Sequence, residues 1–370
     1  MQKADKCAKI NEAIANIAFE GELISCERYG NGHINDTFLV KFDQNGTQVP
    51  YILQRINSDI FTDVDGLMEN IQGVIAFLQK KVTERGGDND REAMQLIYTK
   101  DGKAFYRDSI GSCWRGYVFI RDSVSLDRAE KPEQFYESGV ALGNFQYMLS
   151  EYDASKLHET IPQFHDTPKR YRDFLKAVEE DVCGRAAGVQ EEINFVKERE
   201  PFTHILMDAL HAGKLPLRVT HNDTKLNNVM LDAETGKAVC VIDLDTVMPG
   251  LAANDFGDSI RFGASTAAED ETDLSKVEMS LELFEIYAKG FLEGCHGSLT
   301  DEEIRTLPEG AKMMTLECGM RFLTDYLQGD TYFRIHRENH NLDRCHTQFK
   351  LVADMEKKWE QMHQIVEKFC

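Results

Sequence analysis

The stretch LRVTHNDTKLNNVMLDAETGKAVCVIDLDTVMPG, residues 217–250, decides the fold of this 370-residue chain. A short β-rich run leads into His221-x-Asp223, and Asn228 follows the aspartate five residues later. A predicted hairpin comes next, and its second strand ends at Asp243. These side chains can supply a proton acceptor beside a hydroxyl group and oxygen ligands for a divalent cation.

The order His-x-Asp-x4-Asn, followed by an aspartate at a strand end, resembles the catalytic and metal-binding segments of protein-kinase-like phosphotransferases. Such enzymes need one carboxylate beside the acceptor hydroxyl, and an amide and a second carboxylate that hold magnesium on the ATP phosphates. By this resemblance Asp223 is the catalytic base, and Asn228 and Asp243 are the metal ligands. The expected cofactors are ATP and Mg²⁺.

Further segments narrow the resemblance to the aminoglycoside phosphotransferase and choline kinase superfamily, and within it to the bacterial N-acetylhexosamine 1-kinases. The similarity runs from GNGHINDTF near the start to HNLDRCHTQ near the end. It implies an enzyme that phosphorylates the anomeric hydroxyl of N-acetylglucosamine or N-acetylgalactosamine with ATP and magnesium. The segments that carry it are HNDTKLNNVMLD (221–232), VIDLDTVMPG (241–250), DFGDSIRF (255–262) and RFLTDYLQGDTYF (321–333).

Length and patterning predict an α+β fold with two lobes. Residues 22–56 alternate β-rich runs with turns and predict three antiparallel strands, and a helix with Asp63 as its N-cap follows from Val64. We place residues 1–122 in a sheet lobe that binds nucleotide and 123–370 in a mainly helical lobe with the catalytic loop and the sugar site. Further strands are expected at 95–99, 104–108 and 114–120, and helices at 133–150, 171–187, 193–212, 277–294, 302–328 and 343–369.

Candidate nucleotide contacts lie in the first lobe. Gly30, Asn31 and Gly32 stand between two predicted strands, where glycines let the backbone approach a triphosphate. His33 is a candidate contact to sugar or phosphate, and a solvated turn histidine is the alternative. Phe119 follows the strand that leads to the hinge, so it either lines the adenine pocket or packs in the core.

The third strand, YILQRIN, departs from the wider kinase pattern because it lacks the phosphate-binding lysine. Gln54 or Arg55 stands in that region, and a strand's period of two lets only one of them point at ATP. Arg55 has the charge and is our candidate, whereas Gln54 has the alternative register. Glu69 of the following helix is the candidate partner for such a cation, but it lies nearly opposite the apolar stripe of that helix, so we expect it in solvent.

The carboxy-terminal lobe supplies the candidates for sugar recognition. Resemblance assigns Arg321 and Tyr332 to sugar contacts, and Trp359 is a further aromatic candidate. Asp258 is expected to brace the catalytic loop. Asp245 alternates with Asp243 along a predicted strand, and either binds the metal or supports its ligand.

Charge and composition exclude several classes of protein. The 63 acidic residues outnumber the 42 basic ones and give a net charge of −21, which disfavours nucleic acid and anionic lipid as partners. Nine scattered cysteines and the lack of an apolar leader or long apolar stretch predict a cytoplasmic protein with reduced thiols. Two alternatives remain: a kinase for a cationic acceptor such as choline or an aminoglycoside, and a catalytically silent nucleotide-binding protein.

Overall fold

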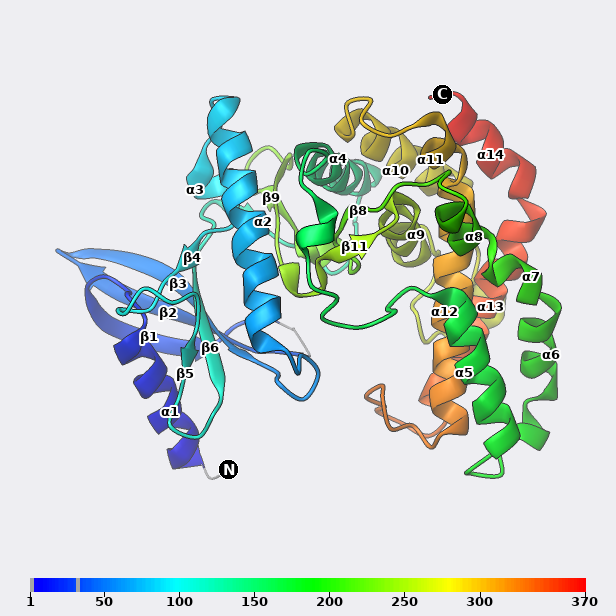
Figure 1. Ribbon diagram of the computed structural model, residues 1–370, viewed down its shortest axis with the longest axis horizontal. Coiled ribbons are helices and arrows are strands. Elements are labelled where there is room, and N and C mark those ends of the chain that lie inside the picture. Colours follow the sequence, from blue (N-terminus) through cyan, green and yellow to red (C-terminus); the bar gives the residue numbers. More distant parts are fainter. Residues whose placement is uncertain (1–2, 31–33) are drawn as a thin grey trace.

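The protein consists of a sheet-containing lobe and a larger helical lobe (Figure 1). A computed structural model describes residues 3–30 and 34–370. Helix α2 (Val64–Glu84) stands between the first sheet and the helical lobe. Its N-cap is Asp63, whose carboxylate accepts the Gly66 N–H at 2.9 Å, as the sequence predicts. This arrangement confirms the predicted two-lobed α+β fold.

All strands of the first sheet pair antiparallel, in the order β1-β2-β3-β6-β4 with β5 paired to β6. The predicted three-stranded start is confirmed. Asn45 and Gly46 make the turn between β2 and β3 with positive φ angles of 58° and 86°, a conformation that Asn-Gly pairs favour in hairpins. The strands are β1 (Glu22–Arg28), β2 (Asp36–Gln44), β3 (Thr47–Ile56), β4 (Leu96–Ile97), β5 (Tyr106–Arg107) and β6 (Cys113–Val118).

The two faces of this sheet have different partners. One face packs Leu53 and Trp114 in a cluster with Ala13 of α1 (Lys3–Asn16), a helix that the sequence analysis does not predict. The other face joins the core around α2 and the second lobe. Because side chains alternate along a strand, Gln54 of β3 lies on the α2 face and Arg55 on the α1 face.

The helices of the second lobe occupy the predicted regions except for α9 (Ala252–Gly263), which the sequence analysis does not predict, and three of the predicted helices are divided into shorter ones. Pro201 and Pro308 fall within two of the predicted helices, and each lies in the first turn of a new helix. Region 193–212 becomes α6 (Gln190–Glu198), α7 (Glu200–Thr203) and α8 (Ile205–His211), 302–328 becomes α11 (Asp301–Arg305) and α12 (Leu307–Leu327), and 343–369 becomes α13 (His340–Lys357) and α14 (Trp359–Glu367).

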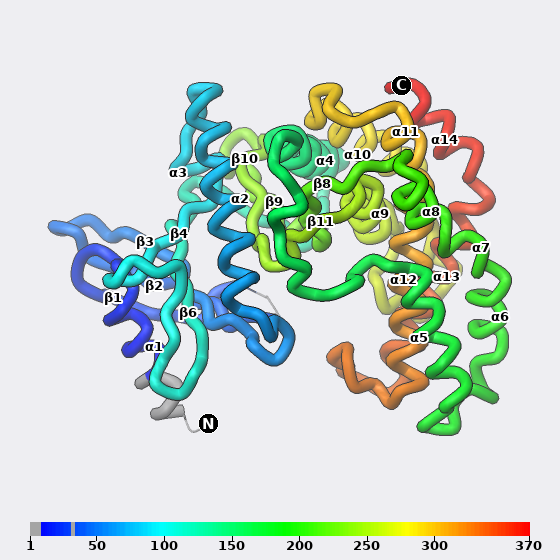
Figure 2. The backbone as a smooth tube through the Cα atoms, in the orientation of Figure 1, coloured from blue at the N-terminus to red at the C-terminus, as the bar shows by residue number. Residues whose placement is uncertain are grey.

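Helix α12 is central to this lobe: it packs against α5 (Thr167–Glu180), α9 (Ala252–Gly263) and α13 (Figure 2). A second close pair is α4 (Pro132–Met148) with α10 (Leu281–Gly294). A Cβ at Gly143 of α4 would lie 2.0 Å from the carbonyl oxygen of Phe291, so only glycine permits this approach. Within residues 3–30 and 34–370, no helix is both long and apolar enough to cross a bilayer.

Two small sheets in the second lobe hold the segments that carry the chemistry. One pairs β8 (Arg218–Thr220) with β11 (Met248–Gly250), and the other has the order β10-β9-β7. The second sheet consists of β7 (Ser123–Val124), β9 (Val229–Asp232) and β10 (Ala238–Val241). Residues 221–228 connect β8 to β9, and residues 242–247 connect β10 to β11, so both loops run between the same two sheets.

Candidate active site

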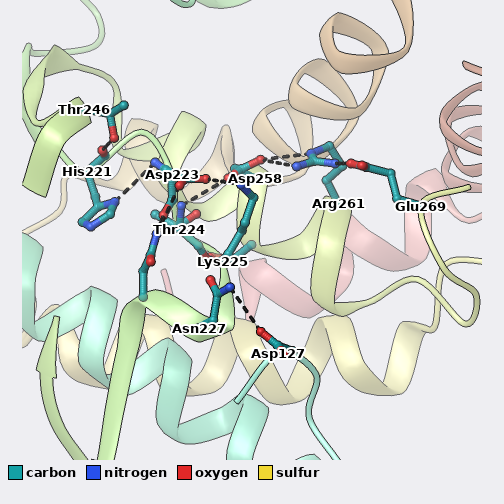
Figure 3. Close-up of polar contacts among 12 residues, drawn as sticks. Asp127, His221, Asp223, Thr224, Lys225, Asn227, Thr246, Asp258, Arg261 and Glu269 are labelled. Atoms are coloured by element: carbon teal, nitrogen blue, oxygen red, sulfur yellow. Dashed lines mark hydrogen bonds and ion pairs between the residues drawn. The ribbon is translucent and has the colours of Figure 1, made fainter. Parts of the chain in front are cut away.

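The loops 221–228 and 242–247 are joined directly by hydrogen bonds. The His221 ring nitrogen Nε2 lies 2.9 Å from the Ile242 carbonyl oxygen, and the Thr246 hydroxyl donates to the His221 carbonyl at 2.7 Å (Figure 3). Asn222 donates its Nδ2 to the Thr246 carbonyl at 2.8 Å. The catalytic loop predicted from the sequence is therefore fixed to the segment that carries Asp243.

Asp255 of α9 holds the backbone of the catalytic loop. Its carboxylate accepts the N–H groups of His221 and Asn222, both at 2.8 Å, and the side-chain amide of Gln146 from α4 at 2.8 Å. Burial raises the pKa of this carboxyl above its usual value. Asn222 has a left-handed φ of 63°. The hydrogen bond from its N–H to the Asp255 carboxylate stabilises this strained conformation. The sequence analysis did not single out Asp255.

Asp258, one helical turn further along α9, also braces the loop, as predicted. Its Oδ2 accepts the Thr224 N–H at 3.2 Å, and its Oδ1 makes an ion pair with Arg261 at 2.9 Å. Arg261 in turn reaches Glu269 at 2.7 Å (Figure 3). Asp258 is therefore engaged with the protein on both oxygens.

The side chains of Asp223 and Asn228 are in direct contact. Asn228 donates Nδ2 to the Asp223 carbonyl at 2.8 Å and to its carboxylate at 3.2 Å. The structure adds Lys225, whose Nζ is 2.8 Å from the other carboxylate oxygen of Asp223. The charge of Asp223 is the main cause that raises the pKa of Lys225, so this lysine stays protonated. Lys225 was not among the predicted site residues.

Asp243 and Asp245 do not share a strand face, because the chain leaves β10 before them. Asp243 has a left-handed φ of 61°, and residues Leu244–Thr246 form a 3₁₀ turn. Asp243 reaches solvent, yet the protein packed around its carboxyl, together with the charges of Asp245 and Asp223, raises its pKa to about 7. Asp245 is only 5% exposed and makes an ion pair with Arg115 of β6 at 2.6 Å.

The side chains at Asn228 and Asp243 fit a magnesium ion. Carboxylate and amide oxygens are ligands that Mg²⁺ takes in proteins, where it keeps further positions for nucleotide phosphates and water. Burial is the main cause of the raised Asp243 pKa, and the repulsion from Asp245 and Asp223 that adds to it would fall if a divalent cation were bound beside these carboxylates. Among the described residues, no three His, Cys, Asp or Glu side chains are placed to hold a metal by themselves.

The predicted nucleotide contacts of the first lobe have different outcomes. Gln54, and not Arg55, points toward Arg115 and the Asp245 loop. Arg55 makes an ion pair with Asp36 at 2.6 Å on the α1 face, so our choice of Arg55 as the cation near the nucleotide is corrected. Alternation along β3 is the physical reason.

The glycine-rich loop is described only in part. Gly30 has a φ of 72°, and a Cβ added there would meet no described atom within 4 Å, whereas Asn31, Gly32 and His33 lie outside the described residues. Phe119 is half-buried just after β6, and its ring meets that of Tyr29 edge to face at 6.0 Å. The adenine contact of Phe119 stays a prediction.

Helix α2 joins the second lobe through Asn70. Asn70 donates Nδ2 to the carbonyl oxygens of His158 at 2.8 Å and Val247 at 3.1 Å, and its Oδ1 accepts the His158 N–H at 2.8 Å. The neighbouring Glu69 is largely exposed, as expected, and its carboxylate lies 2.7 Å from the His158 ring nitrogen Nε2. An amide, and not a buried glutamate, therefore connects this helix to the active-site loops.

Arg321 and Tyr332, the predicted sugar contacts, lie together at the α12 end of the second lobe. The Arg321 Nη2 is 3.5 Å from the Tyr332 hydroxyl, and the guanidinium carbon lies 5.4–5.8 Å from the ring centres of Phe164, Tyr332 and Phe333. Asp325 fixes the turn by accepting the N–H groups of residues 331–333 at 2.8–2.9 Å.

Trp359 does not join this cluster. Its ring lies edge to face with Phe202 at 6.1 Å and against the ammonium group of Lys312 at 5.3 Å. Lys312 is at the other end of α12 from Arg321, more than two helical turns away. We therefore correct the placement of Trp359 in the sugar site: it is a packing residue of α14.

A small sheet lobe, a helical lobe and a carboxylate–amide set on two loops between them define a kinase-like phosphotransferase. Comparison of the sequence with protein-family models agrees, since the model of the phosphotransferase enzyme family (APH) matches residues 25–284. The chain belongs to this family.

Solved structures with the same fold support this placement. An aminoglycoside phosphotransferase from Alicyclobacillus acidocaldarius matches with a TM-score of 0.63 at 11% identity, over 97% of this chain and 96% of that one. Spectinomycin phosphotransferase APH(9)-Ia, solved with ADP and spectinomycin, matches with a TM-score of 0.58 at 13% identity, over 98% of this chain and 99% of that one. A choline kinase from Cryptosporidium parvum Iowa II matches with 0.55 at 15% identity, over 98% of both chains. At these identities the likeness is one of fold.

Replacing Asp255 with asparagine should destabilise the protein. An amide offers one acceptor oxygen where the carboxylate offers two, so at least one loop N–H loses its partner and the unfolding free energy should fall by about 1–3 kcal/mol. Urea denaturation measures this change. Asp273→Asn makes the same exchange at an exposed helix cap and should leave stability nearly unchanged. Equal losses in both variants would contradict the role of Asp255.

Proposed function

We propose that this phosphotransferase is an N-acetylhexosamine 1-kinase, which transfers the γ-phosphoryl group of ATP to the anomeric hydroxyl of N-acetylglucosamine or N-acetylgalactosamine. The observation that supports this best is the cluster of Arg321 with Phe164, Tyr332 and Phe333. A guanidinium group can donate hydrogen bonds to ring hydroxyls and to an acetamido carbonyl, and aromatic rings offer a surface to the apolar face of a sugar.

The packing of α9 on α12 supports an acceptor at this cluster. Helix α9 carries Asp255 and Asp258, which hold the loop of Asp223, and α12 carries Arg321. These two helices pack directly against each other (Figure 2). One rigid helix pair therefore fixes both the candidate base and the candidate acceptor residues, as catalysis by positioning requires.

The charge around Arg321 favours a neutral acceptor over a cationic one. Arg170 of α5 lies close enough that burial and the positive charge of Arg321 together lower its pKa. Two guanidinium groups in this region would repel the ammonium groups of choline or an aminoglycoside. An acetamido sugar carries no charge and presents several oxygens as acceptors.

The reaction would use the residues of the two loops as follows. Asp223 takes the proton of the anomeric hydroxyl, the most acidic hydroxyl of a sugar, while that oxygen bonds to the γ-phosphorus and ADP leaves. Lys225, beside Asp223, places a positive charge near the phosphoryl oxygens. Asn228 and Asp243 would hold Mg²⁺, which neutralises charge on the β- and γ-phosphates when it is bound.

A ³¹P NMR product assay with N-acetylglucosamine, N-acetylgalactosamine, glucose, choline and kanamycin tests this proposal. We expect an anomeric phosphate with the acetamido sugars, recognised by its coupling to the anomeric proton. A 6-phosphate, or transfer to choline or kanamycin alone, would overturn the sugar 1-kinase. If ATP binds but no acceptor is phosphorylated, the protein is a catalytically silent nucleotide-binding protein.

Asp223→Asn should lower turnover by about 10²-fold or more, because the acceptor hydroxyl loses its proton acceptor. Initial rates with the best sugar measure the loss, and ADP affinity by calorimetry should stay close to wild type. Asp273→Asn, the same exchange on an exposed loop, is the control and should retain full turnover. More than half of wild-type turnover in Asp223→Asn would show that another group takes the proton.

Arg321→Ala should raise the KM for sugar by about tenfold or more, the loss expected for a charge-assisted hydrogen bond, and leave the KM for ATP nearly unchanged. Arg321→Lys should recover only part of the affinity because it lacks the planar fork. Arg172→Ala, at an exposed position of α5, is the matched control. Equal increases in the KM values for sugar and ATP would place Arg321 outside the acceptor site.

A further inference from the structure

The first lobe has a buried cation, Arg115, on β6. Strand β6 is the neighbour of β3, the strand on which kinases carry their phosphate-binding lysine. Arg115 of β6 stands directly opposite Gln54 of β3 in the sheet register. The Gln54 side-chain oxygen accepts the Arg115 Nε and Nη2 groups at 3.0 and 2.9 Å. Directly paired residues on antiparallel strands point to the same face, so Arg115 occupies the face on which a third-strand lysine would lie.

Arg115 connects the first lobe to the loop that carries the candidate metal ligand. Its Nη2 lies 2.6 Å from Asp245 Oδ1, and the other oxygen of Asp245 accepts the side-chain amide of Asn35 at 2.6 Å. Asn35 also accepts the Asn57 N–H at 3.0 Å, so it is itself fixed to the end of β3. Two residues of the first lobe, Arg115 and Asn35, therefore bind the carboxylate of Asp245.

The burial of this contact decides which residues can meet a ligand. Arg115 is 1% exposed and Asp245 is 5% exposed, whereas Asp243 reaches solvent. The guanidinium is enclosed by Gln54, Asp245 and the sulfur of Met68 at 3.9 Å. A phosphate cannot approach a group enclosed in this way, so Arg115 differs in role from a lysine that touches ATP.

We propose that Arg115 is a positioning residue for the metal site: through its buried ion pair with Asp245 it holds the 243–247 loop in the position from which Asp243 faces the cation. The proposal rests on the Mg²⁺–ATP part of the proposed function and is independent of the acceptor. Because the same ion pair joins β6 to this loop, it also ties the arrangement of the metal site to the position of the first lobe.

The experiment measures the affinity of the ADP complex for Mn²⁺ by electron paramagnetic resonance, with no sugar present. Arg115→Met should weaken Mn²⁺ binding by about 10–100-fold, the usual cost of losing a residue that orients a metal ligand. ADP affinity without metal should stay within about twofold of wild type, because a buried guanidinium does not reach the phosphates.

A double variant separates positioning from mere stabilisation. Arg115→Met/Asp245→Asn removes both buried charges, so its melting temperature should recover relative to Arg115→Met, while its Mn²⁺ affinity should stay low because the loop has lost its tether. Arg199→Met breaks the Arg199–Glu356 ion pair (2.7 Å) between α6 and α13 and controls for loss of a partly buried charge elsewhere. It should lower the melting temperature and leave Mn²⁺ affinity unchanged.

Three outcomes would overturn the proposal. Unchanged Mn²⁺ affinity in Arg115→Met, or recovery of Mn²⁺ affinity together with stability in the double variant, would make the ion pair purely structural. An equal loss of metal-free ADP affinity would mean that Arg115 contacts phosphate directly. A wild-type protein that binds ADP without recruiting Mn²⁺ would contradict the metal-dependent mechanism as well, whereas failure of the sugar assay alone would leave this result standing.

Discussion

The active site depends on two hydrogen bonds that the buried carboxylate of Asp255 accepts from consecutive backbone N–H groups. The two donors are His221 and Asn222, and the chain turns at Asn222, which has a left-handed φ. Without an acceptor, these two buried donors would each cost free energy, and the left-handed turn would lose its support. Because Asp255 also accepts Gln146, the turn is fixed to α4 as well as to α9. The position of Asp223, one residue later, follows from this turn.

Three side chains of the first lobe reach one short segment of the second lobe, residues 245–247. Asn35 and Arg115 both end on the carboxylate of Asp245, and Asn70 of α2 reaches the carbonyl of Val247. These three side chains come from the end of the glycine-rich loop, from the sheet and from the helix of the first lobe. A displacement of these three side chains would therefore act on residues 245–247, next to the candidate metal ligand Asp243.

Local patterns in the sequence predicted the features that depend on neighbouring residues. The turn between β2 and β3 and the Asp63 cap each depend on residues within a few positions of each other. The helix lengths were wrong where Pro201 and Pro308 begin a new helix, a signal that was present in the sequence. Asp255 was not predicted, because its partners are distant in the chain and nothing in the DFGD run distinguishes it from Asp258.

The cation of the first lobe shows why reasoning along one strand was insufficient. Alternation within β3 limited the choice to Gln54 or Arg55, but a sheet face is shared by neighbouring strands, and the register that places Arg115 beside Gln54 is not visible in the sequence. Arginine suits this position better than lysine. Its planar fork can meet the Gln54 oxygen and the Asp245 carboxylate at once, whereas a single ammonium on a flexible stem would fix neither in orientation. A buried fork that bridges two side chains is suited to setting geometry, and this choice of residue is what distinguishes the first lobe from one that presents a lysine to the phosphates.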